Sequence, residues 1–250
     1  MSRATIFFIG SSGLIFQLDN CLVMIDGILS DSNWFIKQTY SRKKEIKRQF
    51  SSFKGRRIMI FTHCHPDHYD DDSVCEYVSE GCVDTLLLPY DMKYAEKCIS
   101  QESSRSEITV VSGEKCSFYF DNLSIEFIKT AHLQMDGFEN AEHYSVLLSS
   151  ESEKHLISSD MAPDDIIPLI DTVGTDITTF FINPILLGKR KWVKVLAELL
   201  PDTDFYIYHL PDDDMDSYGY KKFVKKNFED YKKYIKSINL LQNQMSDIKR

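Results

Sequence analysis

The sequence lacks the features of a membrane-anchored, secreted or disulfide-bonded protein. No apolar run approaches the roughly 18 residues that are needed to span a bilayer. The first ten residues show no basic segment, no long apolar core and no small-residue cleavage site, so no secretory signal is visible. The six cysteines are scattered without Cys-x-x-Cys spacing. We therefore expect a cytoplasmic protein with reduced thiols and no membrane partner.

An excess of positive charge is also absent. The chain has 29 Lys and Arg against 38 Asp and Glu, which gives a net charge of −9. This balance disfavours a general nucleic-acid binder, which would present a basic face. The one local exception is the basic stretch 42–57, which we interpret as a solvated helix face rather than a phosphate-binding patch. Nucleic acid is therefore a disfavoured partner, and a small molecule is the expected one.

The length of the chain and its alternation of predicted strands and helices predict one α/β domain. At 250 residues, without an internal repeat or a linker, residues 1–250 are expected to form a single domain with a Lys-rich helical tail from about 217 to the C-terminus. Nothing in the sequence indicates an oligomeric state.

Short apolar runs between turn signals predict strands, and longer stretches predict helices. The expected strands are 4–9, 14–18, 21–25, 57–62, 85–88, 107–111, 116–120, 124–130, 144–149, 155–158, 177–182 and 205–208. The expected helices are 31–50, 72–79, 90–100, 163–170 and 189–200. Strands in two groups, each followed by helices, predict a four-layer αββα sandwich of two mixed β-sheets with helices on the outer faces.

The run THCHPDH, residues 62–68, concentrates candidate metal ligands directly after an expected strand. Alternate side chains of an extended segment point the same way, so His63, His65 and Asp67 can converge while Cys64 faces away. His68 follows at the turn and can reach a second ion. Cys64 is interpreted as a small packing residue rather than a ligand.

Three further candidate ligands follow other expected strands. These are His132 in KTAH, Asp160 in SSDM and His209 in YIYH. Alone, each would more often be an ordinary loop residue. Their shared position at the carboxyl end of a strand makes the joint pattern much more specific than any one member.

With these motifs the sequence resembles the metallo-β-lactamase superfamily. The opening ATIFFIGSSGLIFQLDNCLVMIDG, then THCHPDH, KTAH, SSDM and YIYHL occur in the order that this superfamily uses, over roughly residues 4–210. The compact chain and the glycine-rich first turn most resemble the small stand-alone hydrolases related to ascorbate-6-phosphate lactonase.

The resemblance implies two metal sites. His63, His65 and His132 would hold the first ion, Asp67, His68 and His209 the second, and Asp160 would bridge them. It implies a dinuclear metal-dependent hydrolase that uses a metal-bridging hydroxide on a small cytoplasmic metabolite, either a lactone or a phosphoester or phosphodiester. Asp67 is the expected catalytic residue, as both ligand and proton carrier. The ligand types suit Zn²⁺ first, with Mn²⁺ or Fe²⁺ as alternatives.

Other polar residues near these motifs receive weaker assignments. Asp26, at the end of a strand, is expected to support the metal loop by hydrogen bonds without touching a metal. Tyr69 and Tyr208 flank ligands and could bind substrate, although each could equally be a packing residue. His143 could support the site or contact substrate, although a surface or core position is favoured. His155 is expected to face solvent.

Two alternative functions remain open. One is an RNA-processing or nuclease-type phosphodiesterase, since tRNA 3′-end endonucleases share these ligands. The other is a non-catalytic metal-binding scaffold. The third element here is TAHLQ in place of the Gly-His-Thr-Pro-Gly-His of many thioester hydrolases and lactonases of the superfamily, which disfavours thioester hydrolysis. The second ligand set contains no cysteine, which disfavours antibiotic hydrolysis.

Overall fold

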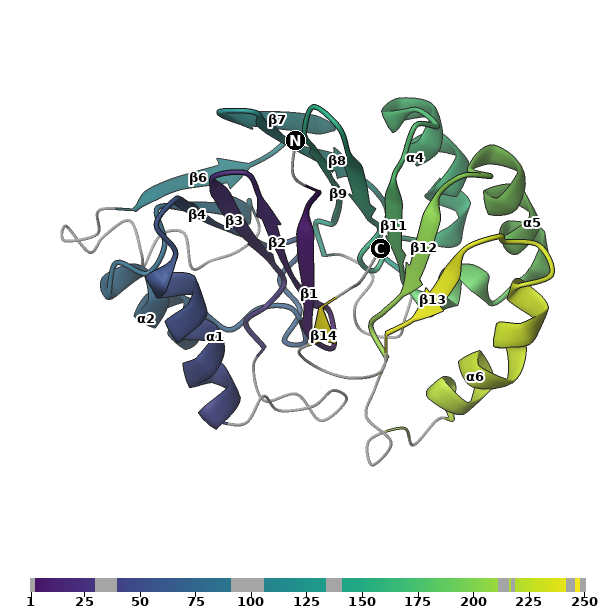
Figure 1. The fold of residues 1–250 in the computed structure, drawn as a ribbon, viewed down its shortest axis with the longest axis horizontal. Coiled ribbons are helices and arrows are strands. Elements are labelled where there is room, and N and C mark those ends of the chain that lie inside the picture. The colour runs from purple at the N-terminus through teal and green to yellow at the C-terminus, as the bar shows by residue number, and fades with distance from the viewer. Residues whose placement is uncertain are drawn as a thin grey trace. The chain divides into compact units, whose positions relative to one another are not determined.

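The computed structural model describes residues 3–29, 40–90, 106–133, 141–210, 216, 219–241 and 246–247 (Figure 1). The chain divides into two compact units, which are residues 1–113 with 243–250 and residues 114–242. The predicted helix 90–100, apart from Tyr90, and the first part of the predicted helix 31–50 lie outside the described residues.

The first unit contains a mixed sheet in the order β14-β1-β2-β3-β4-β5-β6. Its strands are β1 (Thr5–Gly10), β2 (Gly13–Leu18), β3 (Cys21–Ile25), β4 (Arg56–Ile60), β5 (Thr85–Pro89), β6 (Glu107–Val111) and β14 (Ser246–Asp247). β1 to β3 run antiparallel, whereas β3 to β6 run parallel. Every residue of β3 and β5 is buried, as expected for strands that are covered on both faces.

Two helices cover one face of this sheet. They are α1 (Tyr40–Ser52) and α2 (Asp71–Ser79), which lie on the same side of the strands in Figure 1. Phe50 of α1 and Val74 of α2 pack into one buried cluster with Met59 of β4. The helix α2 begins where the carboxylate of Asp70 accepts a hydrogen bond from the backbone N–H of Ser73, at 2.9 Å. The sequence had placed this start one residue later.

The second unit contains the other mixed sheet, in the order β13-β12-β11-β10-β9-β8-β7. Its strands are β7 (Lys115–Phe120), β8 (Leu123–Lys129), β9 (Tyr144–Ser149), β10 (Lys154–Ile157), β11 (Thr179–Ile182), β12 (Asp204–Ile207) and β13 (Ile238–Leu240). β7 to β10 run antiparallel and β10 to β13 parallel. The four parallel strands β10 to β13 therefore end at the same edge, and the candidate site lies at that edge.

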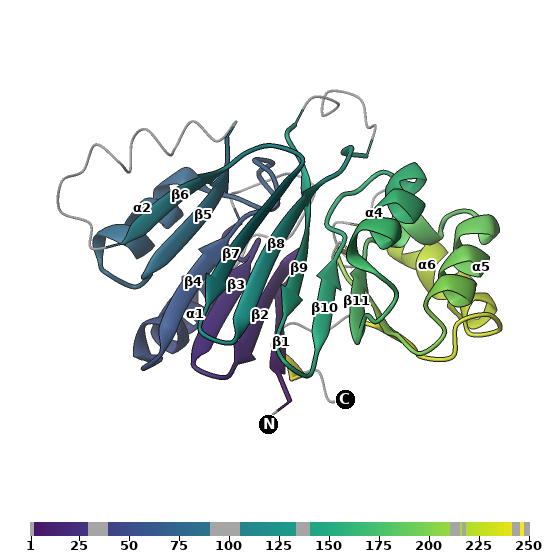
Figure 2. The ribbon, with the colours of Figure 1, turned by 90° about the horizontal axis from the view of Figure 1, so that it is seen from above.

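Helices also cover one face of this second sheet. The helices are α4 (Ile166–Val173), α5 (Arg190–Leu199) and α6 (Tyr220–Tyr231), with the short 3-10 helices η1 (Pro163–Asp165) and η2 (Pro184–Leu187). Figure 2 shows α4, α5 and α6 on the same side of β10 and β11. Leu169, Leu196 and Val224, one from each helix, belong to one buried cluster with Phe205 of β12.

The predicted helical tail from about 217 to the C-terminus is wrong beyond Tyr231. α6 ends there, and the strands β13 and β14 follow it. The apolar residues Val224 and Tyr231 recur at helical spacing, but Ile238–Leu240 pairs in parallel with β12. Strand pairing and burial thus override the helical propensity of the Lys-rich composition.

The predicted fold class is confirmed, since two mixed sheets with attached helices make an α/β protein. None of the five described cysteines forms a disulfide. Among the described helices, none combines the length and the apolar character that crossing a membrane would require.

Candidate metal centre

The first unit places four candidate ligands directly after β4. β3 and β4 are parallel neighbours, so Asp26 and the motif residues leave the sheet at the same edge. The chain turns at residues 66–68 of the motif. The carbonyl of His65 accepts hydrogen bonds from the backbone N–H groups of His68 and Tyr69, at 2.9 and 3.0 Å. The rings of His63 and His65 lie together while Cys64 packs against the core of the first unit, as alternation along this segment predicts, and the turn then brings in His68.

Asp26 holds this turn through its carboxylate. The side chain is completely buried. Oδ1 accepts from the backbone N–H of Thr62 at 2.8 Å, and Oδ2 accepts from the Thr62 hydroxyl at 2.6 Å. Oδ2 also lies 2.9 Å from Nδ1 of His68. These are the supporting hydrogen bonds that the sequence analysis assigned to Asp26.

The same contacts determine which nitrogen of two histidines carries the proton. A carboxylate only accepts hydrogen bonds, so Nδ1 of His68 must donate to Asp26. The Thr62 hydroxyl donates its proton to Asp26, so it can only accept a hydrogen bond from Nδ1 of His63, at 3.0 Å. With one proton on each ring, Nε2 is left with the lone pair that a metal ion requires.

The four ligands of the first unit lie close together. The ring centroid of His63 lies 4.6 Å from that of His65 and 4.0 Å from that of His68. Nε2 of His68 lies 3.7 Å from Oδ2 of Asp67. The hydroxyl of Ser12, in the turn between β1 and β2, donates to the backbone carbonyl of Asp67 at 2.7 Å. The glycine-rich first turn thus helps to hold the ligand turn.

The second unit brings together His132, Asp160 and His209. Asp160 follows β10 and His209 follows β12, and these strands run parallel on either side of β11. His132 follows β8 and forms a bridge with Met161, next to Asp160. The backbone N–H of Leu133 donates to the carbonyl of Asp160 at 2.7 Å, which ties the two segments together.

The carboxylate of Asp160 lies between the two histidines. Its Oδ1 is 3.4 Å from Nε2 of His209, and its Oδ2 is 3.7 Å from Nε2 of His132. Nδ1 of His132 donates to the carbonyl of Leu133 at 2.7 Å, so its Nε2 also keeps the lone pair. One oxygen of the carboxylate therefore faces each histidine.

These separations fit metal ligation. A typical N–H···O hydrogen bond spans about 2.7 to 3.2 Å, shorter than the distances in these histidine–carboxylate pairs. Two ligands about 2.0 to 2.2 Å from a tetrahedral ion lie about 3.3 to 3.6 Å apart. The observed values of 3.4 and 3.7 Å come near that range. Three histidines also have a lone pair on Nε2 that can bind a metal ion. The residues present therefore fit a divalent metal ion.

Sequence reasoning missed Asn183 and Tyr220. Asn183 follows β11, between the strands that carry Asp160 and His209, and its Nδ2 donates to Oδ1 of Asp160 at 2.7 Å. The hydroxyl of Tyr220, the first residue of α6, donates to Oδ1 of Asn183 at 3.2 Å. Burial and the negative charge of Asp160 raise the pKa of Tyr220 well above its ordinary value. The available signal was the position of Asn183 at a strand end.

Three of the six described non-glycine residues with positive φ lie at these strand ends, and the other three lie in hairpin turns. Asp26 has φ of 49°, Ser159 of 48° and His209 of 59°, in the left-handed region that non-glycine residues rarely adopt. Each lies one or two residues after a strand and is a candidate ligand or is next to one in sequence or by hydrogen bond. Such strain concentrates at functional sites, where the surrounding contacts maintain it.

The other predicted residues are placed as follows. Tyr69 is buried edge-on to Phe61, at 4.9 Å between ring centroids. Tyr208 is completely buried, with its ring 6.2 Å from that of His209. Both rings therefore lie against aromatic neighbours. His143 is buried, with Nδ1 2.8 Å from the Thr130 hydroxyl and its ring 5.5 Å from that of His132.

The prediction that His155 faces solvent is wrong. Its side chain is completely buried, and Nδ1 lies 2.8 Å from the Thr179 hydroxyl. The hairpin turn ends before Lys154, so His155 already belongs to β10 and faces into the protein. Cys64 is half-buried and packs against the core of the first unit, as expected for a packing residue.

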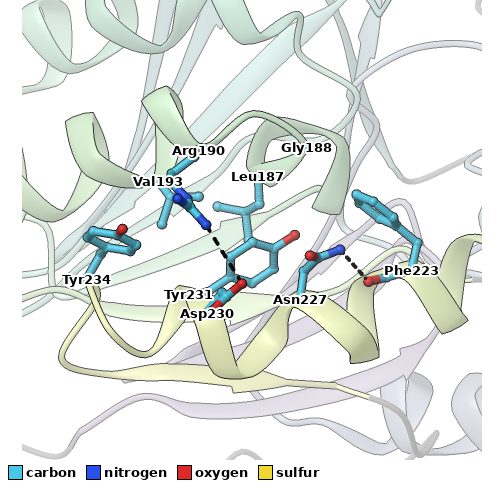
Figure 3. Close-up of a pocket in the computed structure, with 9 residues that line it drawn as sticks. All are labelled: Leu187, Gly188, Arg190, Val193, Phe223, Asn227, Asp230, Tyr231 and Tyr234. Carbon is cyan, nitrogen blue, oxygen red and sulfur yellow. Dashed lines mark hydrogen bonds and ion pairs between the residues drawn. The ribbon is translucent and has the colours of Figure 1, made fainter.

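A separate cavity lies between α5 and α6 (Figure 3). Its volume is about 140 Å³, and Arg190, Asp230 and Tyr231 are among the residues that line it. The hydroxyl of Tyr231 is buried and has no hydrogen-bond partner within the part of the chain that the structure describes. No candidate ligand lines this cavity, so it is not part of the metal centre.

Comparisons with known structures identify the fold of the chain. No family model and no curated protein matches the sequence. The metallo-β-lactamase fold protein YhfI from Bacillus subtilis matches 98% of this chain and 100% of its own, at 14% identity and a TM-score of 0.67. The chain therefore has the metallo-β-lactamase fold.

Two other matching structures differ in their chemistry. CmlA, a diiron β-hydroxylase from Streptomyces venezuelae, matches all of this chain and 55% of its own, at 11% identity and a TM-score of 0.68. The short form of human tRNase Z matches 96% of this chain and 97% of its own, at 10% identity and a TM-score of 0.56. Further neighbours are named metal-dependent hydrolases. The fold alone therefore leaves the reaction open.

Proposed function

We propose that the chain is a dinuclear metal-dependent hydrolase that acts on a small cytoplasmic metabolite. The observation that carries the proposal is the state of the histidines. Nδ1 of His63, His68 and His132 is committed to a hydrogen bond as donor, which leaves each Nε2 able to bind an ion. Nδ1 of His143 and of His155 also lies beside a hydroxyl, so the proposal rests in addition on convergence, since the carboxylate of Asp160 directs one oxygen to Nε2 of His132 and the other to Nε2 of His209.

We assign the ions as the resemblance implies. The first ion would take His63, His65 and His132, and the second would take Asp67, His68 and His209. Asp160 would bridge them, and the approach of each of its oxygens to a different histidine supports this role. Imidazole with carboxylate suits Zn²⁺, while Fe²⁺ and Mn²⁺ accept the same ligands.

Two divalent ions, when bound, lower the pKa of water and polarise the bond that is to be hydrolysed. The side chains supply the rest of the reaction. Asp67 presents Oδ2 beside Nε2 of His68, at 3.7 Å, and has a partly accessible side chain. It is therefore placed both to bind an ion and to carry a proton away from the attacking water. Asp67→Asn is expected to abolish turnover in metal-saturated protein, whereas full activity would exclude this role.

The proposed substrate is a lactone or a phosphoester or phosphodiester of small size. All of these have an electrophilic carbonyl or phosphoryl centre that a water-derived nucleophile can attack. The acidic charge of the chain, −9, favours a small metabolite over a long polyanion.

Metal analysis together with a substrate screen tests this function. Purified protein is expected to contain two divalent ions per chain, identified by elemental analysis, and to hydrolyse a lactone or a generic phosphodiester. His65→Ala should lose turnover, because it removes one imidazole ligand. Full metal content without hydrolysis of any substrate class would contradict the enzyme and favour the metal-binding scaffold.

A nuclease is the second candidate, favoured by the likeness to human tRNase Z. Its only sequence support is the basic stretch 42–57, and part of that charge is already paired. Lys47 contacts Glu76 and Glu80 at 2.6 and 2.8 Å, and Arg57 contacts Asp84 at 2.6 Å. RNA binding that weakens steeply with salt, together with cleavage of a structured RNA, would favour the nuclease. Absence of RNA binding at low salt would exclude it.

A further inference from the structure

We propose that Asn183 is a positioning residue that holds the Asp160 carboxylate in its bridging orientation, and that Tyr220 locks the Asn183 amide. This inference rests on the proposed dinuclear site. All of the residues that carry it belong to the second unit.

The orientation of the Asn183 amide is determined by its neighbours. Its Oδ1 lies 3.1 Å from the backbone N–H of Ile185, which can only donate. The hydroxyl of Tyr220 donates to the same oxygen at 3.2 Å. Two donors on one atom identify that atom as the oxygen, so the NH₂ group must face Asp160.

This orientation in turn restrains the carboxylate. Nδ2 of Asn183 donates to Oδ1 of Asp160 at 2.7 Å, and the same oxygen lies 3.4 Å from Nε2 of His209. With Oδ1 held on that side, Oδ2 remains directed toward His132, at 3.7 Å. Rotation of the carboxylate would bring both oxygens toward one histidine and remove the bridge. The amide therefore favours the orientation that serves two ions.

Tyr220 connects this arrangement to the start of α6. The carboxylate of Asp216 accepts hydrogen bonds from the backbone N–H groups of Tyr220 and Lys221, at 2.5 and 3.0 Å, and so fixes the first turn. The phenol is thereby held against Asn183. Its raised pKa keeps the proton that it donates. Removing only this hydroxyl should loosen the amide without removing the bond to Asp160.

Titration of the metal-stripped full chain with Zn²⁺ tests the proposal. In wild type we expect two ions to bind. Asn183→Leu has a similar volume but cannot donate to Asp160, so the ion proposed beside His209 should bind about 10- to 100-fold more weakly, with a smaller effect on the other ion. The midpoint of thermal unfolding, measured without metal, separates this effect from damage to the fold, since Asn183 also caps η2.

Tyr220→Phe gives a second test that leaves Asn183 in place. Loss of one neutral hydrogen bond should weaken the second ion by about two- to tenfold. Tyr231→Phe is the control, because Tyr231 belongs to the same helix, has a buried hydroxyl and lines the separate cavity (Figure 3). It should leave both affinities within twofold of wild type. If Asn183→Leu fails to fold, Tyr220→Phe decides the question.

The outcomes separate this inference from the proposed function. Two ions in wild type with unchanged affinities in both variants would overturn the positioning role alone. Two ions and weakened variants, but no hydrolysis of any substrate, would support the positioning role and contradict the enzyme. Fewer than two ions in wild type would overturn both.

Discussion

Asp26→Asn tests whether a buried carboxylate prepares His68 for metal binding. Asparagine has nearly the same shape and tolerates the left-handed backbone, φ 49°, that Asp26 adopts. Its oxygen can still accept from the backbone N–H of Thr62, which lies 2.8 Å from Oδ1. Its NH₂ group then replaces Oδ2, the atom that faces the Thr62 hydroxyl and Nδ1 of His68.

The expected cost follows from these three hydrogen bonds. The bond from the backbone N–H of Thr62 is kept. The bond with the Thr62 hydroxyl can be kept if that hydroxyl turns to accept from the new NH₂ group. The bond with His68 can be kept only if Nδ1 becomes an acceptor, which moves the ring proton to Nε2 and blocks the metal-binding atom. The loss is therefore one hydrogen bond to a charged group, about 1.5 to 3 kcal/mol. That corresponds to about 10- to 100-fold weaker binding of the second ion.

Zn²⁺ titration of metal-stripped protein measures this effect, with Asp84→Asn as the matched control. Asp84 also accepts three hydrogen bonds, all from Arg57, at 2.8, 3.0 and 2.6 Å, but it belongs to neither ligand group. We expect the control to lose stability while its metal affinities stay unchanged. Wild-type affinity for both ions in Asp26→Asn would refute the reasoning, because it would mean that the protonation of His68 does not depend on Asp26.

Two further predictions concern stability in the first unit. Burial alone would raise the pKa of Asp84, but the hydrogen bonds and charge of Arg57 outweigh it and lower the pKa. Asp84 therefore contributes stability above its unfolded pKa of about 3.9 that is lost as the pH falls through the folded value. Urea unfolding at several pH values should show a smaller acid loss in Asp84→Asn than in wild type, and equal slopes would contradict this. Gly55→Ala would place a Cβ 2.0 Å from the carbonyl oxygen of Asn20. This clash should lower the free energy of unfolding by about 1 to 3 kcal/mol. The control Ser52→Ala, at an exposed position, should lower it by less than about 0.5 kcal/mol. Equal stability of these two variants would mean that the β2–β3 turn moves to accommodate the added methyl group at little cost in free energy.

The candidate ligands were predictable because each follows an apolar strand. A strand that ends in a histidine or an aspartate leaves a local signal, and parallel neighbours then bring such residues to one edge. β10, β11 and β12 do so for Asp160, Asn183 and His209. The order of strands within each sheet is non-local and was not read from the sequence.

The errors have a different origin. The expected strand 155–158 already included His155, which looked exposed because it follows two charged residues, but β10 lies between β9 and β11 and its His155 side chain is completely buried. Asn183 carries no metal-ligand signal by itself, since its importance comes from a contact with Asp160, 23 positions away. The C-terminal strands were missed for the same reason, because β13 is defined by its pairing with β12.

The Nδ1 atoms of His63, His68 and His132 donate hydrogen bonds to acceptors of three different kinds. Nδ1 faces a carboxylate at His68, a hydroxyl at His63 and a backbone carbonyl at His132. A charged acceptor makes the stronger hydrogen bond and raises the basicity of the ring most, so His68 should be the strongest donor of the three. His68 and Asp67 are both assigned to the second ion, and Asn183 acts on the Asp160 oxygen that faces His209, also assigned to it. The supporting contacts therefore concentrate on one of the two proposed ions. We infer that this second ion depends most on the surrounding protein, so variants of its supporting residues should separate the two affinities.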